Sequence, residues 1–456
     1  MSAEAVTTTA GDAARRVLLA SGGTVIGRVA MFAQFGLVTL LTRGLDRNVF
    51  AWTFTVVNVA LVASSVDRGV GAVVVGLASR GEPIRRLLEL TRPMRVKLRR
   101  TSVVVAGVLF VGELAVLGRG STRLSTLVGL LVLQTVAIVA ILGLVPYERT
   151  AYGQQRVGLI AHATLVSVLI TSAVGLLCAG SGIPVLRDIA PALILMMQPV
   201  TARAIMFRSV MSEAAPAISS AATADETKDR LLVESRHFFV IQMAWTASIG
   251  IDQLLVSLLR PESQAVEFAA HARWFLLAQA VVTVVSANVW PVISSTLAKG
   301  SVDVARRVFA WATVAVVSAS IVIALPPLVG LVPPGLFLMG ATYRQSLLIP
   351  MMLSFVVMQW GQLLGQVQAA VRDVRFQSQV IVPATIANVV ASVVLCLVIG
   401  PEGAPWGTVL SYPVVLVLGS MRLANPAVWQ RSAALSEEAG CGDRRFMCCV
   451  TSTDRH

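Results

Sequence analysis

The sequence predicts an all-α polytopic membrane protein with twelve transmembrane helices, arranged as two six-helix bundles related by pseudo-two-fold symmetry along the membrane normal. Three observations predict this fold: few charged residues, repeated apolar runs of about 20 residues, and basic residues unevenly divided between the loops. Of the 456 residues, 56% are hydrophobic and 13% are charged, whereas a soluble domain averages about 25% charged residues. This composition excludes a soluble, secreted or disordered protein for the bulk of the chain.

The first span follows a polar N-terminus and the basic pair Arg15 and Arg16. Its apolar stretch of about 25 residues is longer than the apolar region of a secretory signal, so we expect an uncleaved span. Apolar runs of spanning length predict twelve spans in all, near residues 17–41, 51–78, 101–118, 127–146, 157–178, 189–210, 237–259, 267–297, 308–331, 345–370, 378–399 and 406–424.

The spans group into two halves. We expect an N-terminal six-helix bundle over 1–211, a cytoplasmic linker over 212–236, a C-terminal six-helix bundle over 237–424 and a cytoplasmic tail over 425–456. A short internal repeat supports this division, because Leu37-Val-Thr-Leu-Leu-Thr-Arg43 at the end of the first span is matched by Leu255-Val-Ser-Leu-Leu-Arg260 at the end of the seventh. Since six is an even number, both halves would enter the membrane in the same direction.

The basic residues predict the orientation of the chain. Twelve spans place both termini on one side, and 27 of the 37 Lys and Arg residues fall on that side, while 8 fall on the opposite side. We therefore expect a multi-pass protein of the bacterial cytoplasmic (inner) membrane with both termini inside. The net charge of +13 then marks orientation, and no nucleic-acid partner is expected.

The most basic segment is the predicted loop Arg80–Arg100 between the second and third spans. Ile84, Leu87 and Leu88 follow helical spacing within it. The segment is therefore either an amphipathic helix that binds anionic lipid headgroups or a solvated orientation signal without a specific ligand.

Several ionisable residues fall inside the predicted spans, where a charge is costly unless it is paired or faces water. Arg28 and Asp67 lie at matching depths, about 16 Å from the inner surface, and Arg68 points away from Asp67. Asp252 and Arg273 both lie about 10 Å from the outer surface. These pairs either hold adjacent helices together, or at least one arginine faces a cavity and attracts an anionic substrate.

Two further polar features mark the spans. Glu113 has no obvious partner at its depth, so it is either a silent protonated carboxyl group or a titrating coupling site. Gln359, Gln362 and Gln366 form a polar stripe down the tenth span, which suits sugar hydroxyls as well as neighbouring helices.

Sequence motifs of enzymes are missing. There is no GxxxxGK[ST] loop for nucleotides, no HExxH and no GxSxG, and the cysteines Cys441, Cys448 and Cys449 have no zinc-site spacing. We therefore expect no enzyme activity, no cofactor and no metal site.

The segment Arg28–Val75 resembles the N-terminal signature of the polysaccharide and O-antigen flippase family of the multidrug/oligosaccharidyl-lipid/polysaccharide (MOP) exporter superfamily. The resemblance rests on the mid-helix arginine, Leu41-Thr-Arg43-Gly-Leu, and Asp67-Arg-Gly69-Val-Gly71. A second stretch, with Asp252, Phe268-Ala-Ala-His-Ala-Arg273 and Pro291, is similar to the family's "D, (Y/F)xxAxR, P" run. Phe50-Ala-Trp52 departs from the Phe-Gly-aromatic sequence usual in the family.

The resemblance implies a flippase that carries a polyprenyl-phosphate- or pyrophosphate-linked oligosaccharide across the membrane by alternating access, for cell-surface polysaccharide biosynthesis. Arg28, Arg68 and Arg273 would bind the anionic headgroup, with the glutamine stripe suited to the sugar. Asp67, Glu113 or Asp252 would couple transport to protons or sodium, and a polysaccharide polymerase or glycosyltransferases would be partners. Two alternatives stay open: a cation-coupled multidrug antiporter of the same superfamily, whose cavity would be lined by acids, and a non-transporting membrane scaffold.

Overall fold

The computed structural model describes residues 81–117, 123–212, 224–331 and 344–434, together with part of the segment 27–79. Within these residues the regular elements are helices, and no strand occurs. The chain divides into two compact units, one formed from Gly22–Ala78 and Glu82–Thr246 and the other chiefly from Ala247–His456. We call them the N-terminal unit and the C-terminal unit.

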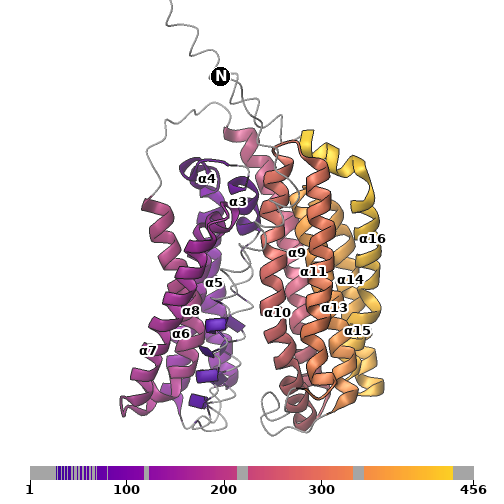
Figure 1. Ribbon diagram of the computed structural model, residues 1–456. Coiled ribbons are helices and arrows are strands. Elements are labelled where there is room, and N and C mark those ends of the chain that lie inside the picture. The colour runs from indigo at the N-terminus through magenta and orange to yellow at the C-terminus, as the bar shows by residue number, and fades with distance from the viewer. Residues whose placement is uncertain are drawn as a thin grey trace, which may run out of the picture. The chain divides into compact units, whose positions relative to one another are not determined.

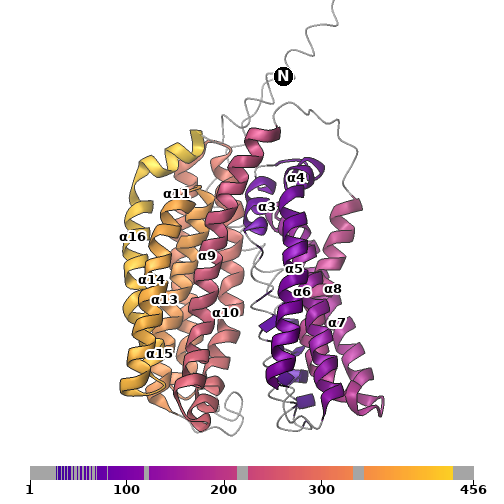
Figure 2. The ribbon, with the colours of Figure 1, turned by 180° about the vertical axis from the view of Figure 1, so that it is seen from behind.

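Helix α6 is the centre of the N-terminal unit. It packs against α3, α5, α7 and α8, and α7 and α8 also pack against each other (Figure 1, Figure 2). Leu127, Leu130, Leu131 and Ile138 of α6 are completely buried, which is unusual for a helix that crosses lipid on its own. The helices of this unit whose bounds the structure describes are α3 (Val70–Ala78), α4 (Ile84–Leu90), α5 (Arg92–Leu117), α6 (Leu124–Gly153), α7 (Val157–Gly180), α8 (Pro184–Ser212) and the first part of α9 (Ala224–Leu259).

Helix α13 has the corresponding central place in the C-terminal unit. It contacts α10, α11, α14, α15 and α16, and it is the most buried of the membrane-length helices in this unit. The helices of this unit are the rest of α9, α10 (Glu262–Leu297), α11 (Val302–Leu328), α13 (Gln345–Ala370), α14 (Val374–Ile399), α15 (Gly403–Ser411) and α16 (Pro413–Ala424).

Seven helices in the described part of the chain are long and apolar enough to cross a membrane: α6, α7, α8, α11, α13, α14 and the combined α15–α16 segment. Large aliphatic side chains are exposed on these helices, for example Leu177 at 74% and Val398 at 73%, as expected of surfaces that face lipid. The predicted fold class, all-helical with two bundles, is therefore confirmed. The predicted spans 17–41 and 51–78 lie largely outside the described residues.

The helices extend beyond the predicted spans at several places. Helix α5 begins at Arg92, so that α4 and the start of α5 make most of the predicted basic loop helical, and α9 begins at Ala224, inside the predicted linker 212–236. Hydropathy marks only the apolar part of a helix, whereas the backbone hydrogen bonds continue through charged residues. The predicted span 406–424 is two helices that meet at Tyr412, because Pro413 lacks the N–H that would continue α15.

The apolar residues of the basic segment are covered by protein. In α4, Ile84, Leu87 and Leu88 are buried, so the apolar face that one of the two interpretations placed on lipid packs inside the N-terminal unit. The basic residues of α5 follow immediately after it.

Candidate functional site

Asp67 caps a short helix in the N-terminal unit. Its Oδ1 accepts a hydrogen bond from the Gly69 N–H at 2.9 Å, and its Oδ2 accepts one from the Gly71 N–H at 2.9 Å. The carboxylate therefore satisfies two of the free N–H groups at the start of α3. Gly69 has a φ of +73°, and its N–H also lies 3.2 Å from Oε1 of Gln242 on α9. This buried turn thus connects α3 to α9.

Arg149 of α6 is the cation that the structure brings to Asp67. It interacts electrostatically with Asp67 and Glu148, and a side chain at Gly71 would come within 2.9 Å of the Arg149 side chain. Glu148 forms an ion pair with Arg203 of α8 at 2.6 Å. Sequence reasoning assigned Arg149 and Arg203 to loops and expected Arg28 beside Asp67.

The predicted cavity arginines cannot be placed. Arg28 and Arg68 lie outside the described residues, and the side chain of Arg273, on α10, is likewise not described. The predicted pairings of Arg28 with Asp67 and of Arg273 with Asp252 therefore remain predictions.

Asp252 joins three helices of the C-terminal unit. Its Oδ1 accepts a hydrogen bond from Ser392 of α14 at 3.4 Å, and its Oδ2 accepts one from Thr408 of α15 at 3.5 Å. Both hydroxyl groups also lie close to Oδ1 of Asn388, at 3.2 and 3.1 Å, and Ser392 lies 2.8 Å from the carbonyl oxygen of Ala404. We call these five residues the Asp252 cluster.

The Asp252 cluster has more hydrogen-bond acceptors than hydroxyl donors. Two hydroxyl groups bring two protons, while the two carboxylate oxygens, the Asn388 amide oxygen and the Ala404 carbonyl oxygen all accept. Asn388, Ser392 and Thr408 are at most 2% exposed, so water contributes little. The Nδ2 of Asn388 has no hydrogen-bond partner among the described residues. Such an oxygen-rich cluster around a carboxyl group is favourable for a small cation or a proton.

Two glycines allow the helices to approach closely at this cluster. A Cβ at Gly407 would lie 2.5 Å from the Ser392 backbone nitrogen and 2.7 Å from its Cα, and a Cβ at Gly403 would clash with the Leu395 carbonyl group. Only residues without a side chain fit there. The close packing of α15 on α14 is what brings Thr408 to Asp252.

A second polar layer lies near the Asp252 cluster. Ser248 of α9 is 3.2 Å from Thr385 of α14, and Tyr412 donates a short hydrogen bond to Ser248. Tyr412 is completely buried at the break between α15 and α16. One face of α14 is therefore polar over Thr385, Asn388 and Ser392.

The N-terminal unit contains a separate buried cluster of neutral polar groups. Nε2 of Gln34 donates to Thr171 of α7 at 2.8 Å and lies 3.2 Å from the Ser172 hydroxyl. Gln198 of α8 donates to Ser167 of α7 at 3.0 Å. Sequence reasoning missed this cluster, although Gln34 and Gln198 stand alone in apolar segments and could have indicated it.

Glu113 lies on α5 next to Gln134 of α6. Both carboxylate oxygens of Glu113 and both polar atoms of the Gln134 amide are buried, with no hydrogen-bond partner among the described residues.

The predicted glutamine stripe occupies α13. Gln359 is 1% exposed, and its Oε1 has no partner among the described residues, whereas Gln362 accepts a hydrogen bond from Thr283 of α10 at 3.4 Å. Gln366 is partly buried. At least one member of the stripe thus contacts a neighbouring helix, and whether any binds sugar stays a prediction.

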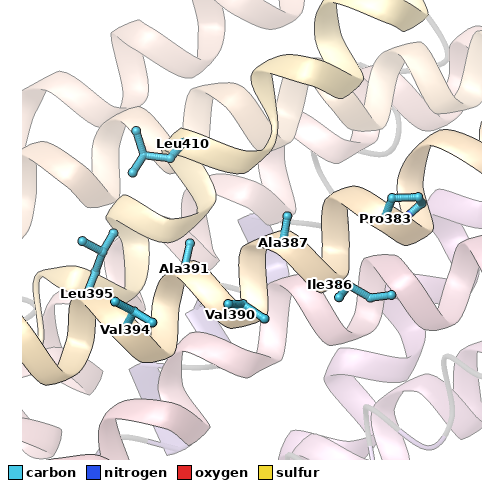
Figure 3. Close-up of a pocket in the computed structure, with 8 residues that line it drawn as sticks. All are labelled: Pro383, Ile386, Ala387, Val390, Ala391, Val394, Leu395 and Leu410. Atoms are coloured by element: carbon cyan, nitrogen blue, oxygen red, sulfur yellow. The ribbon is translucent and has the colours of Figure 1, made fainter.

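An apolar groove lies on the other side of α14 (Figure 3). It has a volume of about 700 Å³. All of its lining residues are aliphatic: Pro383, Ile386, Ala387, Val390, Ala391, Val394, Leu395 and Leu410. Its side chains offer no group that could hold a phosphate or a sugar, so its chemistry suits only hydrocarbon.

The two-unit, all-helical fold with membrane-length helices is similar to the fold of several solved transporters. The chain is similar over 94% of its length to the eukaryotic MATE transporter AtDTX14, with a TM-score of 0.78, 15% identity and 98% of that chain covered. It is also similar to a multidrug resistance MATE family transporter of the MOP superfamily in an outward-facing conformation, with a TM-score of 0.72, 11% identity and 94% and 99% of the two chains covered.

A third similar structure is a MOP superfamily transporter from Pyrococcus furiosus, with a TM-score of 0.70, 12% identity and 94% and 99% of the two chains covered. The binding pocket of that transporter has a reverse polarity, which suggests a different function for that protein. No family model and no curated protein sequence matches the chain. At these identities the similarity establishes the fold.

Proposed function

We propose that the protein is a membrane transporter that moves a polyprenyl-phosphate- or pyrophosphate-linked oligosaccharide across the cytoplasmic membrane by alternating access, and that a proton or sodium ion bound at Asp252 is coupled to this movement. The likeness to MATE transporters supports the transporter class. The choice of substrate rests on the charges within the spans.

The observation that carries this choice is that two acids of the spans, Asp67 and Asp252, are held by hydrogen bonds inside the packed units. Asp67 is bound by two backbone N–H groups and lies near Arg149, and Asp252 is bound by Ser392 and Thr408. An antiporter of cationic drugs needs free acids in its substrate cavity, whereas an anionic phosphate headgroup needs cations. Arg28, Arg68 and Arg273 are our candidates for these cations.

The Asp252 cluster supports ion coupling because its acceptor oxygen atoms outnumber its two hydroxyl donors. A bound cation would supply the missing positive charge, and its binding would draw α9, α14 and α15 together. Coupling follows if the ion binds more tightly to one of the two alternating conformations.

Export of the lipid-linked oligosaccharide in a flippase-deletion strain tests the substrate. The variants Arg28→Ala, Arg68→Ala and Arg273→Ala should each reduce export at least about tenfold, a loss of about 1.4 kcal/mol of binding. Arg306→Ala, on the exposed start of α11, is the matched control and should export normally. Normal export by all three cavity variants would contradict a cationic binding site.

A cation-coupled multidrug antiporter is the second candidate, because one similar structure is a multidrug resistance transporter. It predicts that expression raises resistance to cationic drugs and does not restore glycan export. A non-transporting scaffold predicts neither effect.

A further inference from the structure

Helix α5 carries one exposed stripe whose chemistry changes along the helix. Lys97, Arg100, Val104, Val108 and Val111 are spaced by three or four residues, so they share a face. The three valines are 64%, 67% and 66% exposed, and Lys97 and Arg100 are exposed as well. The α5 stripe, as we call these five residues, therefore changes from cationic to aliphatic within about one helical turn.

The length of the stripe matches one leaflet of a membrane. Arg100 and Val111 are separated by about 16 Å along the helix, and half of a bilayer's hydrocarbon core is about 15 Å thick. An aliphatic surface of this length with cations at one end matches a phospholipid. The acyl chain can lie along the aliphatic part, and the anionic headgroup can contact the cations.

The part of α5 that carries the two cations is tied to neighbouring helices. Arg95, on the same turns of α5, donates to the Leu88 carbonyl oxygen at 2.6 Å and to the Tyr147 hydroxyl at 3.2 Å, which ties α5 to α4 and α6. The part of the α5 backbone that carries Lys97 and Arg100 is therefore held by contacts between helices.

Lys97 and Arg100 are also available to a ligand. Over the described residues neither forms an ion pair, whereas Arg85 and Arg86 of α4 pair with Glu89 and Glu82. Two cations one helical turn apart that form no ion pair among the described residues attract a phosphate group, and an arginine can bind two of its oxygens at once.

We propose that the α5 stripe binds one anionic glycerophospholipid, with its phosphate group at Lys97 and Arg100 and an acyl chain along Val104, Val108 and Val111. This site differs from the expected insertion of α4 into the headgroup region, because the apolar face of α4 is buried. It does not depend on the transported substrate.

The test compares lipid binding to the full-length purified protein in detergent. Native mass spectrometry measures binding of phosphatidylglycerol and of phosphatidylcholine with the same acyl chains. The variant K97Q/R100Q removes one Lys and one Arg from the stripe, and the control K299Q/R306Q removes the same two charges from exposed positions of the C-terminal unit.

The wild-type protein and the control should bind phosphatidylglycerol about tenfold more tightly than phosphatidylcholine, and K97Q/R100Q should retain at most a twofold preference. A full preference in K97Q/R100Q, or an equal loss in the control, would overturn the proposal. If K97Q/R100Q does not fold, the single variants Lys97→Gln and Arg100→Gln should each lower the preference about threefold, and an unchanged preference in both would overturn it as well.

Discussion

Asp252 and Ser392 are 140 positions apart in the chain, yet Oδ1 of Asp252 lies 3.4 Å from the hydroxyl oxygen of Ser392. This contact joins α9 to α14 inside the C-terminal unit. Because Ser392 also lies 2.8 Å from the Ala404 carbonyl oxygen, its single proton cannot satisfy both acceptors. The predictions that follow start from this shortage of protons.

Cation binding at Asp252 should change thermal stability. The unfolding temperature of the wild-type protein in detergent should rise with added sodium or on acidification, because a ligand that binds only the folded state stabilises it. Asp252→Asn should show neither response, since the amide carries no negative charge. Asp303→Asn, at an exposed position of α11, should respond like the wild type. Equal responses in both variants would refute the Asp252 site.

Gly407→Ala should destabilise the protein by about 1–3 kcal/mol through overpacking, because the new Cβ would press on the Ser392 backbone. Gly143→Ala, within α6, has no neighbouring atom within 4 Å and should be neutral or slightly stabilising. Thermal unfolding of the two variants side by side measures the difference. If they unfold alike, the close approach of α14 and α15 is not needed.

Gly69→Ala separates backbone strain from crowding when it is compared with Gly81→Ala. Both glycines have positive φ, +73° and +86°, but only at Gly69 would a new Cβ meet other atoms, chiefly the Ser235 carbonyl oxygen and, at 2.8 Å, the Phe238 Cβ. Both variants lose about 1 kcal/mol from the left-handed conformation, and Gly69→Ala should lose at least about 1 kcal/mol more from crowding. Chemical denaturation measures the free energy of unfolding of the two variants. An equal loss in both would mean that the turn at Asp67 adjusts to accommodate the new methyl group.

The Glu148–Arg203 ion pair should contribute measurably to stability. Its side chains are 16% and 14% exposed, so Glu148→Gln leaves a largely buried guanidinium group unpaired and should cost about 1–3 kcal/mol. The exposed pair Arg85–Glu89 is the control, and Glu89→Gln should change stability by no more than about 0.5 kcal/mol. If Glu148→Gln and Glu89→Gln lowered stability by the same small amount, the Glu148–Arg203 ion pair would be solvated.

Much of the fold could be predicted from hydropathy, because lipid imposes apolar segments of a fixed length. The predicted span 345–370 has the bounds of α13, whereas α5 and α9 begin earlier, in charged segments where hydropathy gives no signal. The break before Pro413 was readable from the proline. Helical ends depend on hydrogen bonding and packing, which a sliding apolar window does not measure.

The candidate site was only partly predictable. Asp252 was predicted as a site residue from its unusual position in a span. Its partners Ser392 and Thr408 come from helices that are distant in the sequence, and depth in the membrane alone does not identify which residues contact Asp252. The i, i+4 spacing of Asn388 and Ser392 was a readable signal of a polar helix face. Arg149 was missed as a neighbour of Asp67 because it was assigned to a loop.

Ion-coupled translocation by the purified protein in proteoliposomes tests the central claim most directly. A fluorescent polyprenyl-pyrophosphate-linked oligosaccharide is the substrate, and its appearance in the opposite leaflet is followed with a sodium gradient, a pH gradient or no gradient. We predict that one of the two gradients accelerates translocation by the wild-type protein at least about tenfold, and that Asp252→Asn translocates at one slow rate under all three conditions. Absence of translocation by the wild-type protein, or an undiminished response of Asp252→Asn to the gradient, would contradict the account.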